Sequence, residues 1–227
     1  MPETDAALAR SILSCPASAE LVVDGHPAVG CDDTLGLRDE GGVPTFSCRS
    51  TAPMAVAGRE ASRALVTLGS GLGPLDGPDR CLTLSLAGRL ELGPMVACTC
   101  CGEQRHDVVL DLDLVVLGRG AGERRRVPLA EFRSPGLGLN RGYLQRALEH
   151  ANDCHCEDLG QVVSRTTGTP AEHLLGVHLA DLTPHGAELG WVDGDGGHRA
   201  CVWFSRPARS VEELGVLLRR ELHAGIC

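Results

Sequence analysis

The stretch Y-L-Q-R-A-L-E-H-A-N-D-C-H-C-E-D-L, residues 143–159, decides how the rest of the chain is divided. Its apolar residues recur every three to four positions, at Leu144, Ala147, Leu148, Ala151 and Leu159. This spacing predicts an amphipathic helix. Residues four apart share a helix face, so His150 is expected beside Cys154, and Asn152 beside Cys156. These side chains are either ligands for a bound group or the polar side of an ordinary helix.

Composition and charge exclude several classes of protein. The chain has 227 residues, of which 43% are hydrophobic, and it contains no apolar run near the ~20 residues that cross a bilayer. The N-terminal residues lack a basic segment followed by an apolar one, so we expect a cytoplasmic protein that does not bind membranes. The net charge of −9 argues against nucleic acid as a partner. All basic charge comes from Arg, and the cluster Arg124, Arg125 and Arg126 is expected to be a solvated turn.

The pattern of elements indicates an α+β protein in two parts. Short strands dominate before residue 132, with the clearest alternation of apolar and polar residues at 80–92 and 107–117, which predicts a closed or partly closed β-barrel. Residues 133–142 are rich in Gly and Pro and are expected to be a linker. After the helix at 143–159 come three predicted strands (177–182, 187–192 and 199–204) and a helix at 210–223. Ser210 and Glu213 form a capping box at the start of that last helix. The predicted domains are therefore residues 1–132 and 143–227.

The cysteines divide into dispersed and clustered ones. Eleven cysteines without an export signal should be mostly reduced thiols. Two clusters combine them with histidine: Cys98, Cys100 and Cys101 with His106, and Cys154 and Cys156 around His155. The spacing does not match the paired C-x₂₋₄-C knuckles of structural zinc sites, whereas adjacent thiols do occur in Cu(I) sites. A Zn or Cu site and a set of plain reduced thiols both remain open.

The second part carries a family resemblance. His150, Asn152, His155 and Leu159 follow the pattern H-x-N-x-x-H-x-x-x-L, and residues 181–186, V-W-F-S-R-P at 202–207, and E-L at 213–214 follow in order. This arrangement resembles the small α/β domain of HugZ-type haem-utilisation and haem-oxygenase proteins and of plant glutamyl-tRNA-reductase-binding proteins. The first part resembles the FMN-binding split barrel of the pyridoxamine-phosphate-oxidase-like superfamily, so the two resemblances together cover nearly the whole chain.

The resemblance implies a haem-binding protein of haem or iron metabolism, with a tetrapyrrole ligand at the interface of a homodimer. It implies an axial histidine after the barrel, for which His150, His155 and His223 are candidates, with Asn152 beside the cofactor. The alternative role of His150 and His155 is structural, as side chains that cap the helix and fix the internal hydrogen bonds of the small domain. Oxygen-dependent haem degradation by an oxidoreductase is one implied activity, and the enzyme class is left open. A non-catalytic module that contacts a partner protein and a thiolate metal-binding protein are the alternatives.

The resemblance does not extend to the flavin phosphate site. Flavin-binding split barrels carry a His-Thr-Arg-Asn-like segment after the third strand. The matching residues 53–56 here are P-M-A-V, which offer no cation for an anionic phosphate. We therefore predict that the chain does not bind FMN.

Overall fold

The computed structural model describes residues 3–27, 29, 36–97, 104–120 and 122–221. It divides into two compact units, Met1–Gly142 and Tyr143–Cys227, which are described separately. Whether each unit is an independent domain stays a prediction. Residues 133–142, the predicted linker, belong to the first unit by their contacts. Asn140 is buried there and donates a hydrogen bond from Nδ2 to Ser14 Oγ at 3.0 Å.

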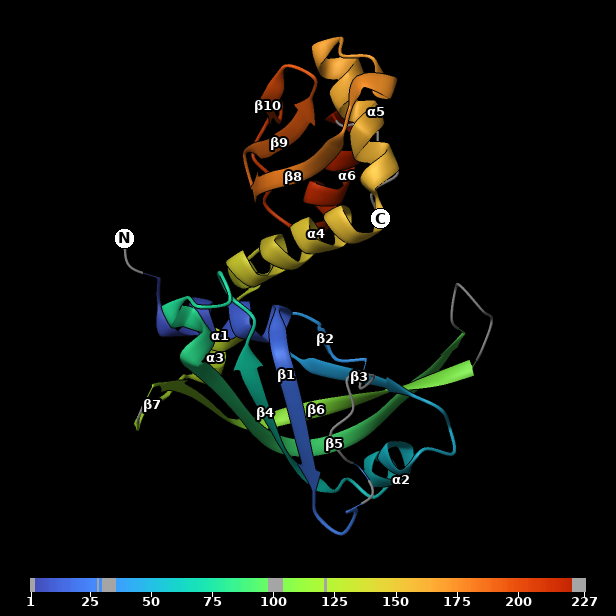
Figure 1. Cartoon of the computed structure of the whole chain (residues 1–227). Coiled ribbons are helices and arrows are strands. Elements are labelled where there is room, and N and C mark those ends of the chain that lie inside the picture. Colours follow the sequence, from blue (N-terminus) through green and yellow to red (C-terminus); the bar gives the residue numbers. More distant parts are fainter. Residues whose placement is uncertain (1–2, 28, 30–35, 98–103, 121, 222–227) are drawn as a thin grey trace. The chain divides into compact units, whose positions relative to one another are not determined.

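The first unit is built on one curled antiparallel sheet (Figure 1). In the described residues its strand order is β1-β4-β5-β6-β3-β2, with β7 paired to β6. The strands are β1 Pro16–Val23, β2 Arg38–Asp39, β3 Pro44–Cys48, β4 Arg63–Ser70, β5 Leu82–Ala97, β6 Gln104–Arg119 and β7 Glu123–Arg126. The sheet curls into a half-barrel, so the unit matches the predicted α+β class with a barrel-like first part.

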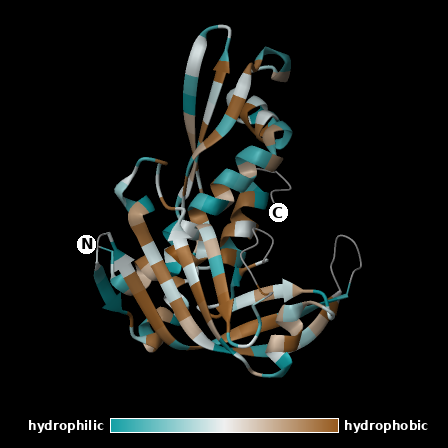
Figure 2. Cartoon of the chain, turned by 60° about the horizontal axis from the view of Figure 1, so that its bottom comes forward, coloured by the Kyte–Doolittle hydropathy of each residue, from teal (hydrophilic) through white to brown (hydrophobic). Residues whose placement is uncertain are grey.

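Alternation along the strands explains which side of this sheet is buried. Leu84, Leu86, Leu110 and Leu117 are completely buried, while their neighbours along the strands are more exposed, an alternation that Figure 2 shows by hydropathy. The register of β5 with β6 shifts between Ala87 and Gly88, a bulge that bends the strands. A Cβ at Gly88 would overlap the carbonyl oxygen of Asp111, so only glycine fits at this bend.

Helices close the buried side of the sheet. They are α1 Asp5–Ser14, α2 Pro53–Arg59 and α3 Leu129–Phe132, with 3-10 turns η1 Pro78–Cys81 and η2 Pro135–Leu137. Arg10 of α1 is 1% exposed, pairs with Asp39 at 2.9 Å and donates to the carbonyl of Phe132 at 3.0 Å. This buried guanidinium therefore connects α1 to β2 and α3.

The prediction for the three arginines 124–126 was wrong. They lie in a strand with exposed side chains and not in a turn, because they pair in register with Val116, Leu117 and Gly118 of β6. β7 ends at Arg126, and Pro128 is the N-cap of α3.

The second unit combines three helices with a small sheet. It contains α4 Arg141–Cys154, which begins at the junction of the units, α5 Cys156–Thr167, η3 Ala171–His173, β8 Gly176–Thr183, β9 Gly186–Asp193, β10 Gly196–Trp203 and α6 Val211–Glu221. The three strands are antiparallel in the order β10-β9-β8. All three predicted strands and the last helix are confirmed. One half of the predicted capping box is present, since the Glu213 backbone N–H donates to Ser210 Oγ at 3.2 Å. The Glu213 carboxylate accepts from the Arg209 N–H at 2.8 Å, one residue before the position that a capping box uses.

The predicted single helix at 143–159 is interrupted. His155 leaves the helical conformation, with φ −127° and ψ 29°, and separates α4 from α5. α5 then continues to Thr167 and ends at Gly168, whose φ of 77° favours glycine. The apolar spacing is compatible with helix on both sides of His155, so it gave no sign of the break.

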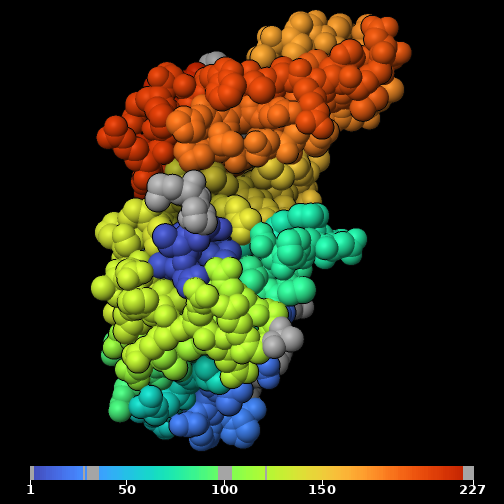
Figure 3. All heavy atoms as spheres, turned by 90° about the vertical axis from the view of Figure 1, so that its left-hand side faces the viewer, coloured from blue at the N-terminus to red at the C-terminus, as the bar shows by residue number. Residues whose placement is uncertain are grey.

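The core of the second unit lies between its sheet and its helices. Ala187, Leu189 and Trp191 of β9 point to one face and are buried. The helices contribute Leu159, Val162 and Val163 from α5, and Leu214, Leu217 and Leu218 from α6. The strands and helices of this unit run from yellow through orange to red in Figure 3 and pack as one body. None of the described helices is long and apolar enough to cross a membrane.

Candidate functional site

The junction of α4 and α5 brings two predicted ligand residues together. The rings of His150 and His155 meet edge to face, with centroids 5.2 Å apart and an interplanar angle of 79°. His155 Nδ1 lies 3.2 Å from Asp158 Oδ2, in the first turn of α5. Its backbone N–H donates to the Ala151 carbonyl at 3.0 Å, so His155 is anchored on both sides of the break.

His150 is the more available of the two imidazoles. It is exposed near the end of α4, and within the described part of the chain it makes no hydrogen bond. Arg146 lies one turn earlier on the same helix face and is also exposed, with no ion pair to any described residue. An accessible imidazole and a guanidinium therefore share one face of α4. Sequence reasoning missed Arg146, although its spacing of four from His150 was visible.

Asn152 has a structural role in this arrangement. Its Nδ2 donates to the Leu179 carbonyl at 3.0 Å, and the Leu179 N–H donates to its Oδ1 at 2.7 Å. The amide thus bonds the backbone of β8 twice, next to the register shift between Leu179 and Asp181. A role beside a cofactor stays a prediction.

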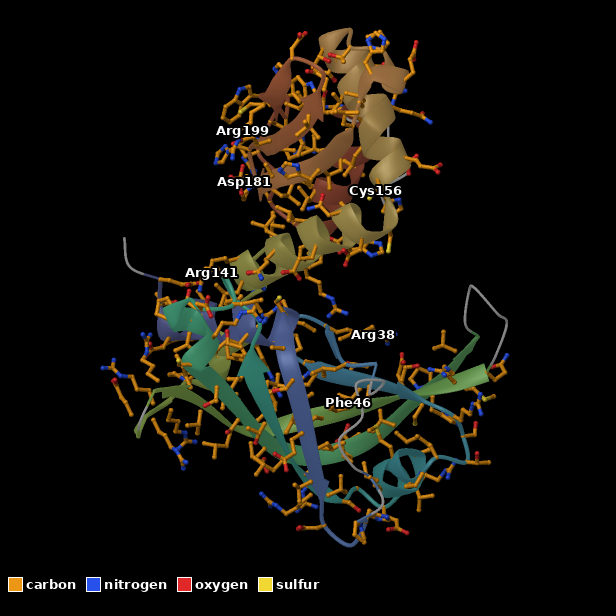
Figure 4. The ribbon with its side chains drawn as sticks, viewed as in Figure 1. Arg38, Phe46, Arg141, Cys156, Asp181 and Arg199 are labelled. Carbon is orange, nitrogen blue, oxygen red and sulfur yellow. The ribbon has the colours of Figure 1, made fainter. Side chains whose placement is uncertain are left out.

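The two thiols of this segment are not joined by a third metal-binding side chain among the described residues, and their role as ligands stays a prediction. Cys154 and Cys156 are both exposed, and Cys156 Sγ donates to the Asn152 carbonyl at 2.7 Å. Figure 4 shows Cys156 at the α4–α5 junction. Across the residues that the structure describes, no group of three His, Cys, Asp or Glu side chains is placed to hold a metal ion.

Of the other predicted ligands, only His106 lies within the described residues. Cys98, Cys100, Cys101 and His223 lie outside the described residues. His106 lies on β6, with Nδ1 at 3.3 Å from the Gly93 carbonyl. The register places it directly opposite Cys48 of β3, a neighbour that the sequence did not indicate. Burial raises the pKa of the Cys48 thiol, and the charges of Arg105 and Arg59 partly oppose that rise.

A polar pocket lies elsewhere in the second unit. It has a volume of about 530 Å³ and is lined in part by Glu172, His173, Asp193 and Asp195. The His198 ring stacks on Trp191 and bonds Asp193 at 2.8 Å, and this bond, with the Asp195 N–H, holds the pKa of Asp193 below its usual value. The acidic lining does not suit a ligand with carboxylates, such as a porphyrin.

The sheet face turned away from the helices is exposed. Trp203 of β10 is 70% exposed and lies over Gly186, where a Cβ would come within 3.3 Å of its ring. Arg199 pairs with Glu188 at 2.8 Å across β10 and β9. Figure 4 shows Arg199 and Asp181 on this side of the unit.

The segment matched to the flavin phosphate site forms the first turn of α2. Its N-cap, Ala52, makes no side-chain hydrogen bond, and Met54 and Ala55 are buried. This turn offers no side-chain donor to a phosphate. The absence of FMN nevertheless stays a prediction.

Comparison with known proteins gives only distant similarity. No protein-family model matches the chain, and no curated protein sequence matches it. A haem-binding protein from Mycobacterium smegmatis has 14% identity and a TM-score of 0.43, with 98% of each chain covered. A protein of unknown function from Agrobacterium tumefaciens has 16% identity and a TM-score of 0.41, over 96% of this chain and 95% of that one. Similarity at this level carries no argument about ligand or reaction.

Proposed function

We propose that the chain binds haem and that His150 ligates the iron. The observation that carries the proposal is the exposed His150 imidazole, which makes no hydrogen bond to any described residue and shares a helix face with Arg146. Haem needs an axial nitrogen ligand, and its propionates pair well with guanidinium groups. The resemblance of H-x-N-x-x-H-x-x-x-L to the haem-utilisation proteins suggests the same ligand.

Exposure and the neighbouring cation favour His150 over His155. One helical turn separates Arg146 from His150, about 6 Å along the axis, so a guanidinium lies within reach of the edge of a porphyrin centred on the imidazole. His155 is half-buried, so its imidazole is less accessible to a porphyrin than that of His150. Its ring instead supports the His150 ring from the side, which limits the orientations that His150 can adopt.

We also propose that the curled sheet is related to the FMN-binding split barrel and that the chain forms a homodimer. One face of α4 can cover only one side of a porphyrin, so a second surface must cover the other side. A second copy of the chain is the proposed source of that surface.

Haem, when bound, would supply the chemistry of O₂ activation. The chain would contribute the imidazole that holds the iron and the Arg146 cation that orients a propionate. Oxygen-dependent haem degradation is a further step of the proposal, tested by adding ascorbate in air to the loaded protein and following decay of the haem absorption band.

A hemin titration tests the proposal. The wild-type protein should give a saturable Soret band, and His150→Ala should lose it while its circular dichroism is unchanged. His185→Ala removes another exposed histidine of the same unit and should titrate like the wild type. Arg146→Ala should weaken binding by up to about fivefold, as expected for one exposed charge pair. A wild-type titration curve for His150→Ala would sink the assignment.

A second function is favoured by the exposed Trp203. Tryptophan is enriched among the residues that dominate protein–protein binding energy, and this ring is 70% exposed on a sheet face. A regulatory module that contacts a partner protein would use this face. If hemin does not bind, a partner retained by the wild type but lost with Trp203→Ser would support this function, and equal retention by both would exclude the Trp203 face.

A further inference from the structure

We propose that Cys48, Met95 and His106 form a binding site for Cu(I) in the first unit. The site uses none of the residues assigned to haem.

Strand register places the three side chains in one row. Cys48 of β3 is directly opposite His106 of β6, and His106 is directly opposite Met95 of β5. Directly opposed residues of antiparallel strands point to the same face, with Cβ atoms about 4.5–5.5 Å apart. The row continues the buried face of the sheet, because the pair Phe46 and Val108 lies two residues further along the same strands. A histidine therefore has a sulfur-bearing side chain on each side.

The His106 ring is held through Nδ1, and no described residue bonds its Nε2. A carbonyl oxygen can only accept, so the 3.3 Å contact with Gly93 requires a proton on Nδ1. In the neutral ring the lone pair then lies on Nε2. Metal-binding histidines are commonly oriented in this way by a backbone carbonyl.

The Met95 thioether contacts the segment that follows Cys48. The Ser50 hydroxyl contacts Met95 Sδ at 3.9 Å, and Ser50 follows the end of β3 by two residues. Met95 starts on β5, and β6 lies between β5 and β3. Ser50 lies in the connection from β3 to α2, and α2 packs against β5 and β6, where Gly58 lies over Val108. The Met95 sulfur and the segment that follows Cys48 are therefore placed over the face of the sheet that carries His106.

This ligand set selects a soft monovalent ion. Thiol, thioether and imidazole groups suit Cu(I), whereas Zn²⁺ prefers four ligands without thioether and Mg²⁺ or Ca²⁺ prefer oxygen. The positive charges of Arg59 and Arg105 near Cys48 also disfavour a divalent ion. Binding would replace the Cys48 thiol proton with Cu(I) and release that proton to solvent, with no change of oxidation state.

The ordinary alternative is that Cys48 and Met95 only extend the apolar core. Cysteine and methionine both pack as hydrophobic residues. That alternative predicts no dependence of copper affinity on Met95, which is 55% exposed and contributes little to the core.

A Cu(I) titration distinguishes a copper site from simple packing of Cys48 and Met95 in the core. The full chain would carry Cys98, Cys100, Cys101, Cys154 and Cys156 replaced by Ser, and would be titrated anaerobically with Cu(I) in competition with bicinchoninate. The first equivalent should bind in this background. Met95→Leu keeps the side-chain volume and should weaken binding about tenfold or more, and Cys48→Ser should abolish it. Met54→Leu, which removes a buried thioether of α2, should bind like the background chain.

X-ray absorption at the copper edge gives an independent readout. The background chain should show copper bound to sulfur and to one imidazole nitrogen. Equal affinity of Met95→Leu and its parent, no binding in the background chain, or a copper environment of sulfur alone would each overturn the proposal. The titration contains no haem, so a negative result leaves the hemin experiment unaffected.

Discussion

At the scale of single residues, Asn152 shows how one side chain joins two elements of the second unit. β8 is an edge strand of the sheet, so one of its sides lacks a neighbouring strand. Asn152 hydrogen bonds both the N–H and the carbonyl of Leu179 on β8. Because Leu179 is only 2% exposed, water cannot replace these bonds without a structural change.

Asn152→Ala should therefore destabilise the second unit. The variant leaves a buried N–H and carbonyl without their partner, and each such group costs about 1–3 kcal/mol. Urea unfolding followed by tryptophan fluorescence measures the loss, because Trp191 and Trp203, the two tryptophans of the chain, both lie in this unit. Asp153→Ala changes the exposed neighbour and should stay within about 0.5 kcal/mol of the wild type. An equally small change for Asn152→Ala would show that the two bonds contribute nothing.

The sequence identified the residues of this site better than their roles. The motif pointed to His150, Asn152 and His155, but the partner of Asn152 lies 27 positions away on β8. Cys48 lies opposite His106 only because β3 pairs with β6, and no local sequence pattern specifies that pairing. The spacing of apolar residues indicates which face of a helix or strand a residue occupies. A binding site depends in addition on which residues of other elements lie opposite that face.

At the scale of elements, alternation predicted the long strands and underestimated their length. β5 runs to Ala97, past the end of the alternation at residue 92 and through Gly93 and Pro94. The structure accommodates these two residues as a register shift between Leu92 and Met95, so the strand continues beyond them. The break of the organising helix at His155 was missed for the converse reason, because no Gly or Pro marks it.

The start of α6 offers a test at the same scale. Ser210→Ala removes the acceptor of the Glu213 N–H and should lower the free energy of unfolding of the second unit by about 1 kcal/mol. Ser210→Asp supplies another cap and should restore most of that loss in the same urea measurement. If the Asp variant were as unstable as the Ala variant, the cap would not be the cause.

At the scale of the whole molecule, the division into two units can be tested directly. A chain of residues 141–227 contains all of α4 and every later element, so it should unfold cooperatively with the same urea midpoint as the tryptophan signal of the full chain. Residues 1–140 give the matched control by circular dichroism. A shorter chain without a cooperative transition would show that the second unit depends on the first.

β8 is an edge strand, and the side of it that has no neighbouring strand affects how the protein can associate. A free strand edge is a template on which other chains can add strands, and proteins that leave one open tend to aggregate. Asn152 engages the backbone of that edge at Leu179, within the same segment that presents His150. The segment that offers the candidate ligand thus also occupies part of an open strand edge, and variants made to test haem binding should be checked for aggregation.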